Sequence, residues 1–303
     1  MSVVQLEARE VSIKTPASGL WSDAWYRLRR NPGAIIGFVI LVALVIIAIF
    51  APLLAPHGPR DQHLELLRQG CCPGPSGAHL FGVDELGRDE LSRLIYGTRF
   101  SLLIGVVSVS VGFALGSVLG AVSGFFGGII DTIIMRITDI WLTIPGFLMA
   151  IGIVALLGPG LFQVMIAIGV VNIPIFTRLL RGSVLAQREN DFVLAARSVG
   201  VPKRSILAAH ILPNAMSPVI VQGTLALATA IIDAAGLGFL GLGPQDPATP
   251  EWGNMLTSTV RYLQTAPFLA IFPGVAIVLV VMGFNLVGDG LREALDPKLR
   301  GRA

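Results

Sequence analysis

Several polar side chains lie inside long apolar stretches of this sequence, where charge is costly and therefore informative. Asp139 and Asp233 are the clearest cases. An ionised group at membrane depth usually pairs with a partner or faces a water-filled cavity. Asp139 follows Arg136 by three residues, so we expect an ion pair within one helix. Asp233 has no such neighbour, and we expect it to face a pore or a partner chain, with helix-to-helix hydrogen bonding as the alternative. Asn172 is a weaker candidate for either role.

Nucleotide and hydrolase chemistry have no matching motif here. A phosphate-binding loop GxxxxGK[ST] needs a Lys that follows Gly, and none of Lys14, Lys203 and Lys298 does so. The motifs HExxH and GxSxG are also absent from the sequence. We therefore expect a chain that is not an enzyme, that contains no catalytic residues, and that binds no cofactor of its own.

Three histidines and both cysteines fall in one polar segment. His57, His63 and His79 share it with the adjacent Cys71 and Cys72. Their spacing matches no metal-ligand pattern, and adjacent thiols coordinate one ion poorly. We therefore expect no metal site, solvated histidines and free thiols, with a vicinal disulfide as the alternative.

The elements that position these residues are long apolar windows. Hydrophobic residues make up 53% of the 303 residues and charged residues 14%, against roughly 25% in soluble domains. A helical span needs about 20 apolar residues. Six windows meet this length: 33–54, 101–125, 133–157, 161–180, 217–241 and 268–288. The first is too long for a cleavable signal peptide and is expected to be a retained anchor. The sequence predicts an all-α membrane protein with six transmembrane helices.

Small residues and helix breakers occur inside these windows. Glycine is frequent there, and small residues allow helices to approach closely. Pro145-Gly146 and Pro174 are expected to kink their helices.

The distribution of Lys and Arg predicts the orientation. With a cytoplasmic N-terminus, sixteen of these residues fall inside and six outside. Both termini are therefore expected in the cytoplasm of a multi-pass protein of the inner membrane. The predicted organisation is a cytoplasmic N-terminal segment 1–32, a first transmembrane helix 33–54, an extracytoplasmic segment 55–100, a five-helix core 101–290 with an inner loop 182–216, and a cytoplasmic tail 291–303.

The inner loop has the pattern of a helical elbow. Four apolar residues lie at i, i+3, i+4 and i+7 and form one stripe: Phe192, Ala195, Ala196 and Val199. Asn190 or Asp191 suits the N-cap, and Gly200 suits the left-handed position after the helix.

A second helix is expected to begin after this turn. Pro202 suits its first turn, and the helix should stop or kink near Leu212-Pro213. An amphipathic elbow of this kind can lie on lipid headgroups or insert into a groove of a partner protein, and spacing alone leaves both open.

The same loop resembles the signature of permeases of ATP-binding cassette (ABC) importers. The matching positions are Ala195-Ala196, Gly200 and Leu212-Pro213, whereas Leu194 replaces the usual Glu and His210 the usual Ile. Segments 81–102 and 238–253, together with the start Arg29-Arg30-Asn31-Pro32, are similar to the C-type subunit of the dipeptide, oligopeptide and nickel branch.

This resemblance implies a type I importer permease fold, in which residues 190–200 form the coupling helix that docks on an ATPase. It also implies several partners: a homologous second permease, two ATPase subunits or one fused ATPase that bind ATP and magnesium, an extracytoplasmic binding protein, and membrane lipid but no nucleic acid. The expected cargo is a dipeptide or oligopeptide, with nickel or haem as alternatives. An ion-coupled secondary transporter is the rival from another class, but such proteins usually carry inverted repeats, and no repeat is evident here.

Overall fold

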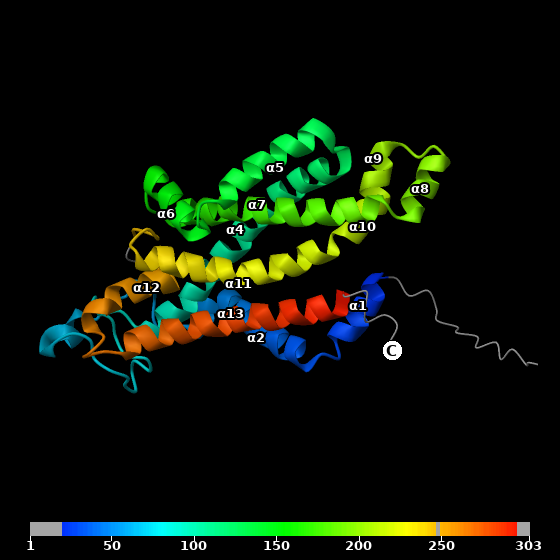
Figure 1. Cartoon of the computed structure of the whole chain (residues 1–303). Coiled ribbons are helices and arrows are strands. Elements are labelled where there is room, and N and C mark those ends of the chain that lie inside the picture. The colour runs from blue at the N-terminus through cyan, green and yellow to red at the C-terminus, as the bar shows by residue number, and fades with distance from the viewer. Residues whose placement is uncertain (1–19, 247–248, 296–303) are drawn as a thin grey trace, which may run out of the picture.

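The computed structural model describes residues 20–246 and 249–295, and its regular structure is helical (Figure 1). Within the described residues there is no strand, only one isolated antiparallel bridge between Val83 and Asp89. The predicted segments 1–32 and 291–303 lie partly outside the described residues. The predicted all-α class is confirmed.

The long helices carry the predicted spans. They are α2 (Pro32–Ile49), α4 (Glu90–Phe126), α7 (Leu161–Arg188), α11 (Ser217–Phe239) and α13 (Phe268–Leu295). Each is long and apolar enough to cross a membrane. The short α3 (Ala51–Leu54) continues α2 after a break at Phe50. Five predicted windows are thus confirmed as helices.

The remaining window, 133–157, is not one straight helix. Helices α5 (Gly128–Leu142) and α6 (Gly146–Leu157) meet at an angle of 90°, so the pair is a broken span or a re-entrant turn. Pro145 explains the break, because it has no amide hydrogen and disfavours helical backbone at the residue before it. The predicted kink at Pro145-Gly146 is confirmed, but a single continuous span is wrong.

Glycine sets the central packing. Helix α4 packs most extensively on α7. The glycines of α4 on this interface recur every four residues: Gly112, Gly116, Gly120 and Gly124. A β-carbon at Gly120 would lie 2.5 Å from the carbonyl oxygen of Thr177. A spacing of four residues places these glycines along one helical face, which lets the two backbones approach closely.

The remaining helices flank this pair. Helix α11 contacts α4, α7 and α13, and α13 in turn packs on α2. Many large apolar side chains of α2 stay exposed, among them Ile36, Phe38 and Val39. An apolar surface of this extent fits lipid or a partner chain as its environment.

The two ends of the bundle differ. At one end, α8 (Asp191–Ser198) and α9 (Lys203–Ser205) form an elbow, and α1 (Leu20–Leu28) and the C-terminal end of α13 lie at the same end (Figure 1). The opposite end holds the segment between α3 and α4, with the 3-10 turn η1 (Leu64–Gln69), and also α12 (Trp252–Thr259) with the turn η3 (Val260–Tyr262). We call these the elbow end and the far end.

Candidate functional site

The elbow has the predicted local chemistry. Asn190 is the N-cap residue by its extended backbone, although its side chain bonds Gln187 instead of a free amide of the helix. Gly200 has φ of 80°, and its amide donates to the carbonyl of Arg197. The amide of Val201 donates to the carbonyl of Ala196. This pair of bonds is the Schellman ending of a helix, for which glycine is suited because it adopts positive φ without strain.

The face that α8 buries differs from the predicted stripe. Val193 and Ala196 are buried in the chain's own core, next to the turn that follows α9. Phe192, Ala195 and Val199 are exposed, and Val199 has 79% of its surface accessible. Of the predicted stripe, only Ala196 packs inward. An apolar surface therefore stays open on the elbow end.

The second arm of the elbow is irregular. Pro202 caps the short α9, which continues as the π-helical turn η2 (Ile206–Ile211) and then as α10 (Leu212–Ala215). Pro213 lies in the first turn of α10 and has no amide hydrogen to bond the preceding turn. The predicted boundary near Leu212-Pro213 is confirmed, but it is a change of helix type that leads on into α11.

A buried ionic network occupies the far end. Asp84 lies 2.7 Å from Arg88 Nε and 3.4 Å from Arg93 Nε, and all three side chains are buried. The Asp84 carboxylate also accepts hydrogen bonds from the backbone amides of Leu86 and Arg88, each at 2.9 Å. Removing one member of such a buried network leaves an unpaired charge, so the network acts as a unit.

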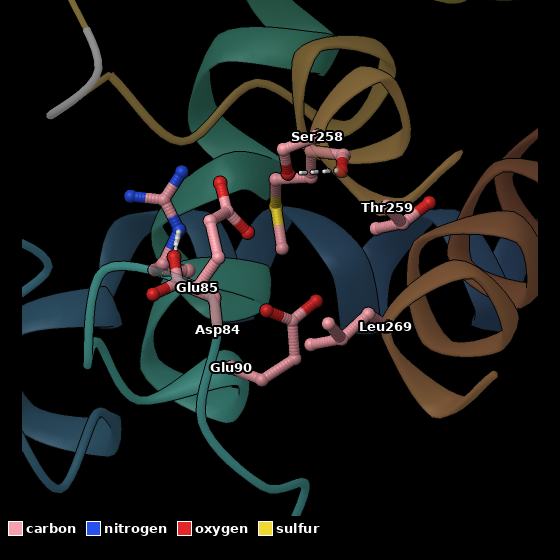
Figure 2. Close-up of a pocket in the computed structure, with 8 residues that line it drawn as sticks. Asp84, Glu85, Glu90, Ser258, Thr259 and Leu269 are labelled. Atoms are coloured by element: carbon pink, nitrogen blue, oxygen red, sulfur yellow. Dashed lines mark hydrogen bonds and ion pairs between the residues drawn. The ribbon is translucent and has the colours of Figure 1, made fainter. Parts of the chain in front are cut away.

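Two further carboxyl groups lie beside this network (Figure 2). Glu90 and Glu85 each have a buried carboxyl oxygen without a hydrogen-bond partner among the described residues. Burial raises the pKa of Glu90 to about 8, since the charged form loses its hydration there. The tight pocket around them is lined by Asp84, Glu85, Glu90, Arg93, Met255, Ser258, Thr259 and Leu269. An open pocket of about 340 Å³ adjoins it and offers both carboxylate and guanidinium groups.

The two stretches singled out at 81–102 and 238–253 meet in space. The Trp252 side chain is buried, and its Nε1 donates to the carbonyl of Leu94 at 3.1 Å. A β-carbon at Gly97 would lie 2.5 Å from the carbonyl oxygen of Pro250. The start of α4 is thereby fastened against α12.

Glu251 is the N-cap residue of α12 and is almost fully buried. Its carboxylate accepts hydrogen bonds from the backbone amides of Gly253 and Asn254 and so caps the helix. Burial raises the pKa of Glu251, and these two amide bonds oppose the increase.

The polar candidates inside the apolar windows differ in their partners and burial. Asp139 pairs with Arg178 of α7, so the predicted partner Arg136 is wrong. Asn172 is buried where α7 meets α4, and its amide donates to the carbonyl of Ile168 at 2.8 Å. Asp233 is half-buried in α11, and among the described residues no ion pair or hydrogen bond reaches it.

One ion pair between α5 and α7 was not anticipated from the sequence. The Asp131 carboxylate of α5 accepts two hydrogen bonds from Arg181 of α7, one of them at 2.7 Å, and a third from Ser123. The sequence separation of 50 between Asp131 and Arg181 puts this pair beyond any i, i+4 pattern. Both residues lie just outside the apolar windows, so no local pattern in the sequence indicates this pair.

The three histidines of the far end are not separate solvated loop residues. His79 is buried, and His57 and His63 are half-buried. One nitrogen from each ring lies within 4.8 Å of the others. The segment folds back on itself, so the expectation of solvated histidines is wrong for the buried His79.

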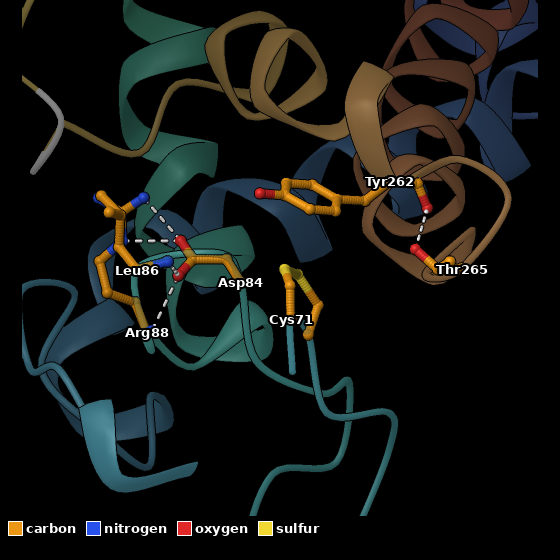
Figure 3. Close-up of a disulfide and its surroundings, with 7 residues drawn as sticks. Cys71, Asp84, Leu86, Arg88, Tyr262 and Thr265 are labelled. Atoms are coloured by element: carbon orange, nitrogen blue, oxygen red, sulfur yellow. Dashed lines mark hydrogen bonds and ion pairs between the residues drawn. A yellow bond between two sulfur atoms is a disulfide. The ribbon is translucent and has the colours of Figure 1, made fainter. Parts of the chain in front are cut away.

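Cys71 and Cys72 are joined in a vicinal disulfide, so the expected free thiols are replaced by the alternative (Figure 3). Cys72 is buried against Ala266 and Leu269 at the start of α13. The disulfide therefore lies where the far-end segment meets the last long helix.

Comparisons with known proteins add to this geometry. Residues 116–301 match the sequence profile of the binding-protein-dependent transport system inner membrane component. Residues 19–70 match the N-terminal transmembrane domain of oligopeptide transport permease C.

Two curated relatives are similar along most of their length. The dipeptide transport system permease protein DppC of Alkalihalophilus pseudofirmus is 47% identical over 92% of this chain and 90% of that protein. The glutathione transport system permease protein GsiD of Escherichia coli is 45% identical over 95% of this chain and 93% of that protein.

A solved structure shares the fold. An inward-facing form of the methionine ABC transporter MetNI matches with a TM-score of 0.57 and 20% identity, over 68% of this chain and 97% of that chain.

Proposed function

Since the chain belongs to the dipeptide and oligopeptide branch of ABC importer permeases, we propose that it forms half of a translocation pathway for short peptides. It is a membrane-embedded transport subunit. The reported relatives are named for dipeptide and glutathione transport, and both cargoes consist of amide-linked amino acids. These names favour the peptide class over nickel or haem.

The observation that carries the proposal is the uncovered apolar surface of the elbow. Phe192, Ala195 and Val199 are exposed on a helix whose opposite face, Val193 and Ala196, is fixed in the core. An apolar helical face held rigidly away from the bundle fits a groove on a partner. We assign this face, within residues 190–200, to docking on an ATPase subunit that binds ATP and magnesium.

The family supports proposals for the remaining partners. A homologous second permease would complete the pathway and cover exposed apolar faces of the long helices. An extracytoplasmic binding protein would deliver the cargo to the far end, where the open pocket presents carboxylate and guanidinium groups. The elbow end would then face the cytoplasm, and the inner membrane would surround the bundle.

A charge on the exposed elbow face tests the docking role. Val199→Glu should lower ATPase co-purification at least tenfold, because an unpaired carboxylate in a protein interface costs several kcal/mol. Uptake of a labelled dipeptide by proteoliposomes should fall in parallel. Leu263→Glu is the matched control, because it adds the same charge at an exposed apolar position of the far end. It should leave ATPase binding unchanged.

Ala196 is the wrong position for this test. Its side chain is packed in the chain's own core, so Ala196→Glu would unfold the elbow whether or not the elbow docks. Wild-type ATPase binding and uptake by Val199→Glu would exclude the exposed face as the docking surface. The alternative, in which the elbow lies on lipid headgroups, would then be preferred.

The cargo class has its own test. The chain, reconstituted with its permease, ATPase and binding-protein partners, should take up dipeptides in a vanadate-sensitive manner, and an excess of unlabelled dipeptide should compete. Uptake that continues without ATPases under an ion gradient would indicate a secondary transporter.

A further inference from the structure

We propose that His57, His63 and His79 form a binding site for one divalent transition-metal ion of the zinc class at the far end of the molecule. The site rests on the geometry of the histidines and holds whether or not the elbow docks an ATPase. Its role would be to fasten the segment between α3 and α4 onto the start of α4.

The three rings form a compact triangle. The ring centroids of His57 and His79 are 4.8 Å apart, those of His63 and His79 are 5.2 Å apart, and those of His57 and His63 are 5.3 Å apart. One nitrogen from each ring lies within 4.8 Å of the other two. Imidazole nitrogens around a tetrahedral zinc ion, at about 2.1 Å from it, lie roughly 3.4 Å apart. On binding, the rings would rotate to close the remaining distance.

Asp89 prepares His79 for this role. The Asp89 carboxylate lies 2.9 Å from His79 Nδ1, and an ionised carboxylate only accepts hydrogen bonds. The ring proton is therefore on Nδ1, and the lone pair of Nε2 is free for an ion. A carboxylate behind a ligand histidine fixes the ring orientation and raises its basicity, as is usual at zinc sites.

The other two rings carry buried nitrogens without a hydrogen bond in the described part of the chain, and one of them, His57 Nδ1, lies 3.8 Å from Asp89 Oδ2. Within the described residues, His57 Nδ1 and His63 Nε2 are both buried without a hydrogen-bond partner. The opposite nitrogen of His63, Nδ1, lies 3.4 Å from Glu65 Oε1, so a carboxylate stands behind this ring too. Buried polar atoms without a partner are rare and call for an explanation. A bound metal ion would satisfy both.

The backbone holds the site in place. The amide of His57 donates to Ser92 Oγ at 3.0 Å, and the amide of His63 donates to the carbonyl of Gly87 at 2.7 Å. Asp89 also caps α4 by accepting from the amide of Ser92 at 2.8 Å. The ligands are thus tied to one short stretch, 87–92, before any ion binds.

The ligand set selects the class of ion. Three imidazoles suit zinc, nickel and copper, whereas magnesium and calcium prefer oxygen ligands. A fourth position remains for water, because His57 and His63 are partly exposed, with 27% and 31% of their side-chain surface accessible.

The test uses the permease purified with its partner subunits, stripped with a chelator and equilibrated with zinc alone. Wild type should retain one zinc per copy of this chain. His63→Ala should weaken zinc affinity about a hundredfold, because it removes a ligand, and Asp89→Asn about tenfold, because it removes the carboxylate behind His79. Asparagine caps helices as well as aspartate, so α4 stays intact in Asp89→Asn. Cobalt in place of zinc should show tetrahedral d–d absorption that His63→Ala abolishes.

Two controls make the result decisive. His210→Ala removes the remaining histidine of the sequence, which lies on the elbow arm, and should leave zinc binding unchanged. The double variant Cys71→Ser and Cys72→Ser should also keep its zinc, which excludes reduced thiols as ligands. Unaltered zinc content in His63→Ala, or loss of zinc in the serine double variant, would overturn the proposal.

Discussion

Glu90 is the first residue of α4, and its buried carboxyl group lies at the far end of the molecule, before the apolar part of that helix. With 37 residues α4 is about 55 Å long, which exceeds a bilayer core of about 30 Å, and its charged first turns project outward. The pKa of Glu90 is about 8 in the folded chain, against an ordinary value of 4.5. Between these pH values the folded chain holds one more proton than the unfolded chain. Its stability should therefore fall as the pH rises from about 4.5 to about 8.

Glu90→Gln should flatten this pH dependence, because the amide is neutral throughout. The slope removed is at most about 1.4 kcal/mol per pH unit. The measurement is the melting temperature of the purified complex from pH 5 to pH 8. The pKa of Glu251 is also raised, but it contributes equally to wild type and to Glu90→Gln. The difference between their pH slopes therefore reports on Glu90 alone. Equal slopes would show that Glu90 ionises normally.

Asp233 and Asp139 allow a paired comparison inside the membrane. Asp233→Ala should lower peptide uptake severalfold at unchanged expression, because a half-buried carboxylate without a partner among the described residues does not hold helices together. Asp139→Ala should instead leave transport per molecule unchanged, because Asp139 bonds Arg178 across two helices. Uptake is normalised to the amount of assembled protein. Full uptake by Asp233→Ala would show that Asp233 has no role in the translocation pathway.

At the scale of elements, the contact between α4 and α7 depends on glycines that leave no room for a side chain. A β-carbon at Gly120 would lie 2.5 Å from the carbonyl oxygen of Thr177, so the two helices must separate to admit it. Gly120→Ala should destabilise the protein by roughly 1–3 kcal/mol through overpacking, despite the better helix propensity of alanine.

Gly274→Ala is the control for this prediction. Gly274 lies in α13, and a β-carbon there would have no neighbour within 4 Å. The variant should be neutral or slightly more stable. Thermal unfolding of both variants in detergent decides the matter, and equal melting temperatures would show that the α4–α7 interface tolerates separation.

At the scale of the whole molecule, the prediction concerns which end of the bundle faces the cytoplasm. The elbow, α1 and the end of α13 share one end (Figure 1), and the vicinal disulfide belongs to the segment between α3 and α4 at the other end (Figure 3). The excess of Lys and Arg predicts that the elbow end is cytoplasmic. After mild reduction, a membrane-impermeant maleimide added to right-side-out membrane vesicles should label Cys71 or Cys72. The double serine variant should give no signal. Labelling confined to inside-out vesicles would reverse the orientation.

The sequence by itself determined the features whose causes are local. Apolar length predicted the spans, Pro145 the break before α6, and Gly200 the ending of α8, because hydration, a missing amide hydrogen and a positive φ each act within a few residues. The family also followed from ordered motifs and was confirmed by the relatives. Local rules did not supply the angle of the break, which depends on what the two halves pack against.

Only the tertiary structure decided which distant groups meet. Asp139 bonds Arg178 across two helices and not Arg136 one turn away, since helix packing brought a better-placed guanidinium. Ala196 turned inward because the second arm of the elbow covers that face. The three histidines converged because the far-end segment folds onto the start of α4, and such long-range contacts leave no periodic trace in the sequence.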